Sequence, residues 1–169
     1  YDDTVMENYL EGNEISEIEL HKCVKEGVNT LKLTPVYMGS AFKNKGVQVL
    51  LEAVARYLPS PTESVKPIAI NADTHEKISL NPDPAEGLVC MAFKITDEQF
   101  GQLTYTRIYR GTLNKGETVY NTRTKKKVRI GRMVRMNSND RENINEAHAG
   151  DIIAIVGMEC ASGDTFVGK

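Results

Sequence analysis

The chain has 169 residues, of which 40% are hydrophobic and 26% charged, so it can hold one ordinary domain or two small ones with a packed core. Its formal net charge is only -2, but the charge is segregated: residues 122–135 hold seven Lys or Arg and no acidic residue, whereas the first twenty residues hold no Lys or Arg. Because no apolar run approaches the roughly 20 residues of a membrane span, we expect neither a membrane-spanning helix nor an export signal.

Two short helices are predicted at the start of the chain. Asp2 to Thr4 supply capping side chains ahead of the first helix, and Gly12 is placed to end it. Ser16 and Glu19 have the spacing of a capping box, which predicts a second helix that ends at Gly27 or just after. Helices this short are not stable alone, so we expect them to pack against other parts of a folded domain.

The next segment is predicted to form a strand, a loop and a helix. Residues 31–38 are largely apolar, and we expect the second half of this strand to be the better formed because Pro35 interrupts it. Apolar residues recur at helical spacing from Val47 to Leu58, and Pro59 ends this helix. Together these elements make one α/β unit.

Proline composition marks a linker after this unit. Residues 59–86 contain five of the six prolines of the chain. Two stretches within it, VKPIAIN and KISLN, are candidates for short extended segments. We therefore place the domain boundary here.

The last part of the chain, residues 87–169, is predicted to form a small antiparallel barrel, because runs of β-branched and aromatic residues alternate with glycine-bearing turns. A polar connection ending in Phe100-Gly101 joins the first two strands. Alternation fails near Gly131, where we expect a β-bulge, and the polar stretch 141–151 is interpreted as a connection. A barrel of this size fills its interior with side chains. The expected strands are 88–96, 103–110, 117–121, 127–136, 151–156 and 165–167.

The stretches FGQLTYTRIYRGTLNKGETVYN, RMVRMNSNDRENINEAHAGDIIAIVG and ASGDTF resemble the β-barrel second domain of elongation factor G, the ribosomal translocation GTPase. The sequences FGQLTY, YNTRTKKKVR and CASGDTF are most similar to the mitochondrial-type branch of this family and its bacterial relatives. The resemblance implies an α+β fold class. It divides the chain into the C-terminal part of an α/β GTPase domain (1–59), a linker (60–86) and a six-stranded-type antiparallel β-barrel (87–169).

The loop GSAFKNKG resembles the fifth guanine-nucleotide motif of translational GTPases. The resemblance assigns Ser40 and Ala41 to a guanine-base contact, with Phe42 at a position that the family varies. The phosphate-binding pattern G-x-x-x-x-G-K-[ST] and the Asn-Lys-x-Asp element are absent from the sequence. We therefore expect GTP with Mg²⁺ in the parent protein, but no cofactor, no catalytic residue and no activity in this fragment alone.

The basic run from Arg123 to Arg135 has two interpretations. By composition alone, a solvated strand face is favoured. The resemblance favours an RNA contact instead, because the second domain of these factors leans on small-subunit ribosomal RNA. The candidate RNA-binding residues are Lys125, Lys126, Lys127 and Arg129, with Arg107 a weaker candidate.

Other chemistry-bearing residues are dispersed. The three histidines and three cysteines lack the spacing of metal ligands or of a disulfide framework, so we predict no metal site. Tyr105, Tyr109 and Tyr120 are candidates for a base-stacking platform, although packing on the barrel is favoured because the first two have even spacing on one strand.

The resemblance implies a role in the GTP-dependent movement of tRNA and mRNA during elongation. The implied partners are the small-subunit ribosomal RNA and the remaining domains of the parent, with a monomeric fragment, no membrane, and a cytoplasmic or, in a eukaryote, mitochondrial-matrix location. Two alternatives stay open: another translational GTPase of the ribosome-recycling or ribosome-protection type, and a free-standing RNA-binding barrel. A plain binding module would have no need of the GSAFKNKG loop.

Overall fold

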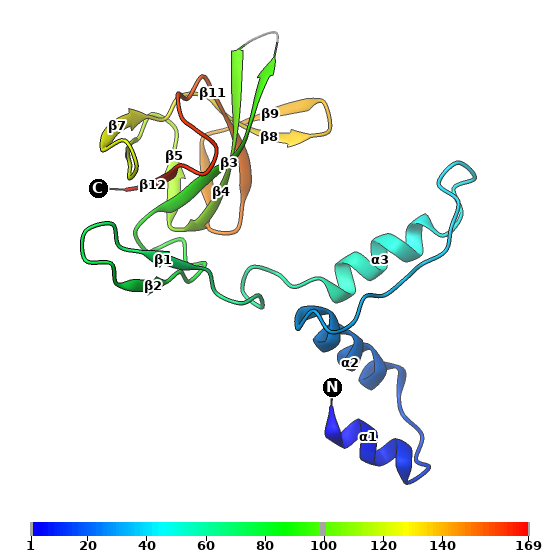
Figure 1. Cartoon of the computed structure of the whole chain (residues 1–169). Coiled ribbons are helices and arrows are strands. Elements are labelled where there is room, and N and C mark those ends of the chain that lie inside the picture. The colour runs from blue at the N-terminus through cyan, green and yellow to red at the C-terminus, as the bar shows by residue number, and fades with distance from the viewer. Residues whose placement is uncertain (1, 99–100, 169) are drawn as a thin grey trace. The chain divides into compact units, whose positions relative to one another are not determined.

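The computed structural model describes residues 2–98 and 101–168 and divides the chain into two compact units, Tyr1–Ser64 and Val65–Lys169 (Figure 1). Phe100, expected in the connection between the first two barrel strands, lies outside the described residues. Within the described ranges, no helix is both long and apolar enough to cross a membrane.

The first two helices begin where the sequence predicts, because side chains cap their N-terminal amides locally. α1 (Asp3–Leu10) follows Asp2, whose carboxylate accepts hydrogen bonds from the amides of Thr4 (3.1 Å) and Val5 (3.3 Å). α2 (Glu17–Asn29) follows Ser16, which forms the predicted capping box with Glu19.

The predicted strand over residues 31–38 is wrong. The structure has no strand there, and Val36 and Met38 are 86% and 95% exposed. A strand is held by hydrogen bonds to a neighbouring strand, and none of the described residues pairs with this segment. Apolar composition typical of a buried strand therefore does not form one here, because no strand pairs with it among these residues.

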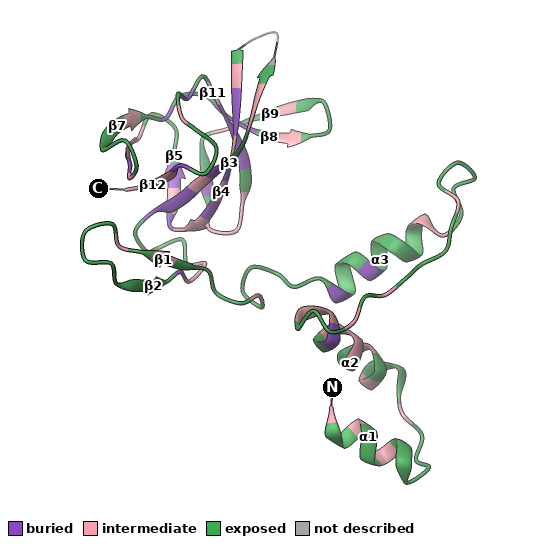
Figure 2. Ribbon diagram, viewed as in Figure 1, coloured by how far each residue is buried: buried purple, intermediate pink, exposed green. Residues whose placement is uncertain are grey.

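α3 (Val47–Tyr57) confirms the predicted helix, but most of its apolar face is uncovered in the first unit. Ala53 and Tyr57 are its buried residues, whereas Leu51 and Val54 are 62% and 46% exposed. Figure 2 shows the same contrast as short buried patches on a largely exposed helix. Tyr57 contacts α2, where its hydroxyl lies 2.5 Å from His21 Nδ1.

A β-hairpin opens the second unit, inside the segment expected to be a linker. β1 (Ile68–Ile70) pairs antiparallel with β2 (Lys77–Ser79), at the two stretches expected to be extended. Leu80, directly after β2, is buried.

An antiparallel sheet forms the body of the second unit and confirms the predicted fold class. Its strands follow the order β7-β6-β12-β3-β4-β11-β8-β9, and β10 pairs with β5. The strands are β3 (Val89–Glu98), β4 (Gly101–Arg110), β5 (Thr112–Asn114), β6 (Thr118–Asn121), β7 (Lys126–Arg129), β8 (Met133–Asn137), β9 (Asp140–Ile144), β10 (Glu146–His148), β11 (Ile152–Val156) and β12 (Thr165–Val167).

One apolar cluster fills the inside of this sheet. Val119 on β6 and Met133 on β8 lie far apart in the strand order, yet both belong to the cluster that contains Ile108 and Phe166. The sheet therefore curls around this cluster, and a smaller cluster of Leu103, Val134 and Ala154 is separate from it. Both contribute to the buried regions of the strands in Figure 2. Each large apolar side chain buried in this way contributes about 1.5–3 kcal/mol.

Two segments of the barrel differ from the sequence prediction. The strand expected over 127–136 is two strands: β7 pairs with β6, whereas β8 pairs with β11 and β9. Ile130, buried between them, donates its amide hydrogen to the Glu117 carbonyl (2.8 Å), so the irregularity near Gly131 is a change of partner and not a bulge. The polar stretch 141–151, expected to be a connection, instead contributes to β9 and β10. The sequence of β9 is polar because β9 is an exposed edge strand.

Candidate nucleic-acid interface

The loop assigned to guanine recognition is a tight turn closed by two backbone hydrogen bonds. The amide of Ser40 donates to the Lys45 carbonyl (2.9 Å), and the amide of Lys45 donates to the Ser40 carbonyl (3.0 Å). Gly46 adopts a φ of +76°, and a Cβ there would lie 2.9 Å from the Met38 carbonyl oxygen, so the close return of the chain requires glycine.

The turn leaves its tip open to a ligand. Phe42 is 99% exposed, and the backbone N–H groups of Ala41 and Phe42 have no partner in the part of the chain that the structure describes. Such amides can donate hydrogen bonds to a base, so Ala41 is free to make the contact assigned to it, whereas the Ser40 amide is bonded within the turn.

Four of the five predicted RNA-binding residues lie on one β-hairpin, formed by β6 and β7 and called the basic hairpin here (residues 118–129). Lys125, Lys126, Lys127 and Arg129 are all exposed. Tyr120 pairs with Lys127, and Thr118 pairs with Arg129. The side chains of Tyr120, Lys127, Thr118 and Arg129 therefore lie on the same face of the hairpin. Val128 lies on the opposite face and packs against the core, which directs Lys127 and Arg129 outward.

The turn of the basic hairpin is held by Asn121. Its side-chain oxygen accepts hydrogen bonds from the amides of Arg123 and Thr124, each at 3.0 Å, and its carbonyl accepts one from Lys125 (2.9 Å). Lys125 has a φ of +59°. The turn thus fixes the backbone from which the lysines project.

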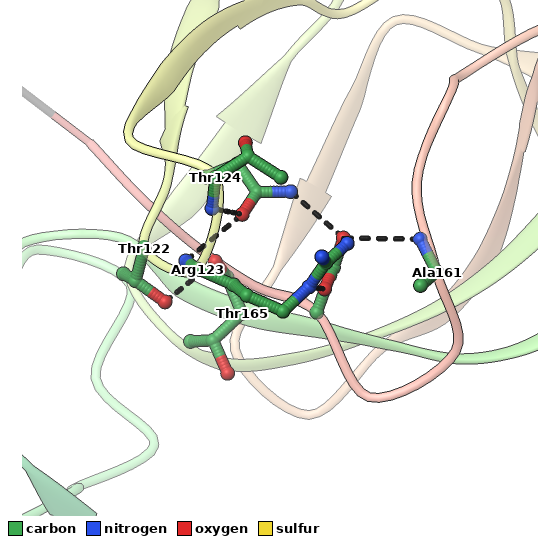
Figure 3. A network of polar contacts seen from close by, with 7 residues as sticks. Thr122, Arg123, Thr124, Ala161 and Thr165 are labelled. Carbon is green, nitrogen blue, oxygen red and sulfur yellow. Dashed lines mark hydrogen bonds and ion pairs between the residues drawn. The ribbon is translucent and has the colours of Figure 1, made fainter.

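A buried carboxylate, Asp164, anchors this turn to the loop before β12. Its side chain is 1% exposed and accepts hydrogen bonds from Asn121 Nδ2 (2.8 Å) and the Ala161 amide (3.0 Å). The guanidinium of Arg123 forms an ion pair with it through Nε and donates a second bond from Nη2 (2.9 Å). Figure 3 shows Arg123 and Ala161 reaching this carboxylate from two segments. Arg123 is therefore held by a buried carboxylate and belongs to the network that fixes the turn.

Sequence reasoning did not find Asp164 or its role. The signal available was its position in ASGDTF, but an acidic residue in a short polar stretch has many uses. The pairing with Arg123 joins residues 41 positions apart, which no local pattern encodes.

The Asp164 carboxyl makes the barrel sensitive to acid. The Arg123 guanidinium holds the pKa of this carboxyl well below its ordinary value of 3.8; burial opposes this effect, and the Ala161 amide and Asn121 add to it. A carboxyl whose pKa is lower in the folded state stabilises the fold above about pH 3.8, and this contribution is lost as the pH falls toward the folded value. We expect the free energy of unfolding to fall below pH 3.8 more steeply in the native chain than in Asp164→Asn. Urea titrations of both proteins followed by circular dichroism measure the difference, and parallel curves would contradict it.

Arg107, the weaker candidate, lies elsewhere on the barrel. It is half-buried on β4, and three strands (β6, β12 and β3) separate β4 from β7 in the sheet. The structure therefore does not bring Arg107 together with the lysines of the basic hairpin.

The tyrosines are also distributed. Tyr105 on β4 packs beside Phe93, with ring centroids 6.5 Å apart, and Lys94 Nζ lies 5.3 Å from its ring centre. Tyr120 stands alone among them on the basic hairpin. A continuous platform of the three tyrosines is therefore absent from the described strands.

The described residues contain neither a disulfide nor a cluster of metal-ligating side chains. Cys23, Cys90 and Cys160 are free thiols, and burial raises the pKa of Cys90 to about 12. No group of three or more His, Cys, Asp or Glu side chains that could hold a metal ion occurs among these residues.

Comparison with known proteins identifies relatives along almost the whole chain. Residues 101–167 match the family described as elongation factor Tu domain 2. The chain is 49% identical to elongation factor G 1 of Borreliella afzelii, 51% to elongation factor G of Rhodopirellula baltica and 46% to mitochondrial elongation factor G-1 of Arabidopsis thaliana, with 98% of the chain covered each time. It covers 24%, 24% and 22% of these relatives, so it spans about a quarter of their length.

A solved structure has a similar fold along almost the whole chain. A crystal structure of a protein from Thermus thermophilus matches 99% of this chain with a TM-score of 0.70 and 27% identity, and the match covers 23% of that protein. The family match and the three relatives confirm the resemblance to elongation factor G inferred from the sequence, with a translation-factor barrel as its second part.

Proposed function

We propose that this chain, a homologue of one segment of elongation factor G, is part of a ribosomal translocation GTPase that promotes GTP-dependent movement of tRNA and mRNA. In this proposal the first unit is the end of the GTPase domain, and the barrel docks on RNA of the small ribosomal subunit. The parent protein holds the phosphates of GTP and the Mg²⁺ ion through residues outside this chain, and its remaining domains cover the apolar face of α3.

The observation that carries the docking role is the basic hairpin. Lys125, Lys126, Lys127 and Arg129 are exposed within one turn and one edge strand, and Lys127 and Arg129 share a face. Clustered cations neutralise phosphates and release counterions, which supplies affinity without reading the RNA sequence. An edge strand also lets an RNA backbone approach without steric hindrance from a further strand.

Replacing the three lysines together should weaken binding to small ribosomal subunits and reduce its salt dependence. If all three contact phosphates, the slope of log K against log salt in Lys125→Ala/Lys126→Ala/Lys127→Ala flattens by roughly two to three units. Equilibrium titrations of the 169-residue chain at several salt concentrations measure this slope.

A matched control removes the same charge elsewhere in the second unit. Lys66, Lys77 and Lys115 are exposed and lie outside the basic hairpin. Their triple alanine variant should keep the native slope. Equal slopes in the native chain and the basic-hairpin variant would show that the hairpin is only a solvated face.

The guanine loop leads to a second expectation. Ser40 and Ala41 supply only base contacts, whereas phosphate and Mg²⁺ contacts provide most of the affinity for a nucleotide in this enzyme class. We therefore expect no measurable binding or turnover of GTP by this chain alone. Calorimetric titration with GTP and Mg²⁺ tests this, with GDP and ATP as controls, and tight binding of GTP would refute the assignment.

A further inference from the structure

A cleft lies on the outside of the barrel, between the β1–β2 hairpin and the strands beside it. Its volume is about 640 Å³, within the range of roughly 300–1,000 Å³ typical of small-molecule pockets. One wall is the β1–β2 hairpin with its turn, residues 68–73 with Ile78 and Leu80. The other is the outer face of the barrel, including Tyr120 and Val167.

Tyr120 divides this cleft from a second hollow. Tyr120 and Val167 line both the cleft and a smaller hollow of about 200 Å³ that also contacts Lys127. The two residues face each other across β6 and β12 in register, so they form a ridge with a concave surface on each side. An aromatic ring in this position can stack with a flat ligand that enters the cleft.

The charges around the ridge are cationic on the barrel side. Lys125 lines the cleft and Lys127 lines the smaller hollow, and both belong to the basic hairpin. Arg110, also a lining residue, is held by Glu86 (3.1 Å) and by the Gly87 carbonyl (2.9 Å). Asp73 on the hairpin turn lies 3.9 Å from Lys125 Nζ and is the carboxylate among the lining residues.

We propose that this cleft takes an unpaired nucleobase of an RNA bound by the basic hairpin, stacked against Tyr120, with neighbouring phosphates on Lys125 and Lys127. The proposal rests on the proposed RNA-docking function and specifies the form of RNA recognised. An apolar cleft with an aromatic wall and lysines at its rim matches a base, which is flat and apolar on its faces, attached to an anionic backbone. A duplex keeps its bases stacked inside, so it cannot use this cleft.

The test uses two RNA hairpins that carry one 2-aminopurine at the same position. The 2-aminopurine is bulged in the first hairpin and paired with a uridine in the second, and the hairpins are otherwise identical. The 169-residue chain should bind the bulged RNA about fivefold or more tightly than the paired one, because stacking on an aromatic side chain supplies this much per base. Binding should also change the fluorescence of the bulged 2-aminopurine.

Tyrosine variants assign the effect to the cleft. Tyr120→Val should abolish both the preference and the fluorescence change, whereas Tyr120→Phe, which keeps the ring, should retain both. Tyr109→Val is the matched control, because Tyr109 lies on β4 and does not line the cleft. Asp73→Asn should tighten binding of both RNAs by about two- to fivefold, because it removes the carboxylate that competes for Lys125.

The outcomes separate this proposal from the docking function. Equal affinities for the two RNAs, with the salt slope still dependent on the three lysines, would overturn base insertion and leave phosphate docking intact. A preference that persists in Tyr120→Val would place the base elsewhere and overturn the cleft assignment. Binding of neither RNA, together with an unchanged salt slope on ribosomal subunits, would overturn both. A cleft occupied by a protein segment predicts equal affinities and no fluorescence change.

Discussion

Replacing Asp164 with alanine is expected to lower the free energy of unfolding of the barrel by about 3 kcal/mol. The carboxylate is 1% exposed and accepts hydrogen bonds from Asn121 Nδ2, the Ala161 amide and the Arg123 guanidinium. Alanine leaves these donors without an acceptor, and Asn121 is itself buried at 1% exposure. Loss of the anchor also frees the turn that positions Lys125. Native-state hydrogen exchange of the barrel amides measures the change.

Two variants show which part of the network carries this stability. Arg123→Ala should cost only about 1 kcal/mol, because the guanidinium side chain is 60% exposed and water can replace part of its role. Asp140→Ala, at an exposed carboxylate on β9, should stay within about 0.5 kcal/mol of the native chain. Equal effects of Asp164→Ala and Asp140→Ala would show that the buried network does not stabilise the barrel.

Substitution of Gly111 by alanine should have a comparable or larger effect, of about 3 kcal/mol or more. Gly111 is buried between β4 and β5 with a φ of +79°, which L-residues adopt at a cost of about 1–2 kcal/mol. A Cβ there would also lie 2.6 Å from Leu88 Cα and 2.7 Å from the Glu86 carbonyl oxygen. These are backbone atoms, so relief of the clash requires the start of β3 to move.

Gly116 provides the matched control for the conformational part of this cost. Its φ of +84° is similar, but a Cβ there would meet nothing within 4 Å. Gly116→Ala should therefore lose only about 1–2 kcal/mol, from the backbone strain alone. Thermal or urea unfolding of the two variants measures the contrast. Equal losses would show that the close approach of Gly111 to Leu88 is unimportant.

Features that depend on neighbouring residues in the chain could be predicted before the fold was known. Asp2 and the Ser16–Glu19 pair fix the starts of α1 and α2, because a capping side chain acts within three residues. The pattern of β-branched residues likewise predicted most strands of the barrel, and the four candidate RNA-binding cations of the basic hairpin are close together in sequence. Recognition of the elongation factor G resemblance was also possible from the sequence alone.

Features that depend on partners far along the chain became visible only in the folded structure. Residues 31–38 have the composition of a strand but no pairing neighbour among the described residues, and residues 127–136 divide because β7 and β8 pair with different strands. Arg123 and Lys125 belong to the same basic run in the sequence, yet the Arg123 guanidinium is held by Asp164 while Lys125 lies on the rim of the cleft. Hydrogen bonds, ion pairs and clefts form between residues that folding brings together, so composition places a charge on the chain but cannot say what faces it.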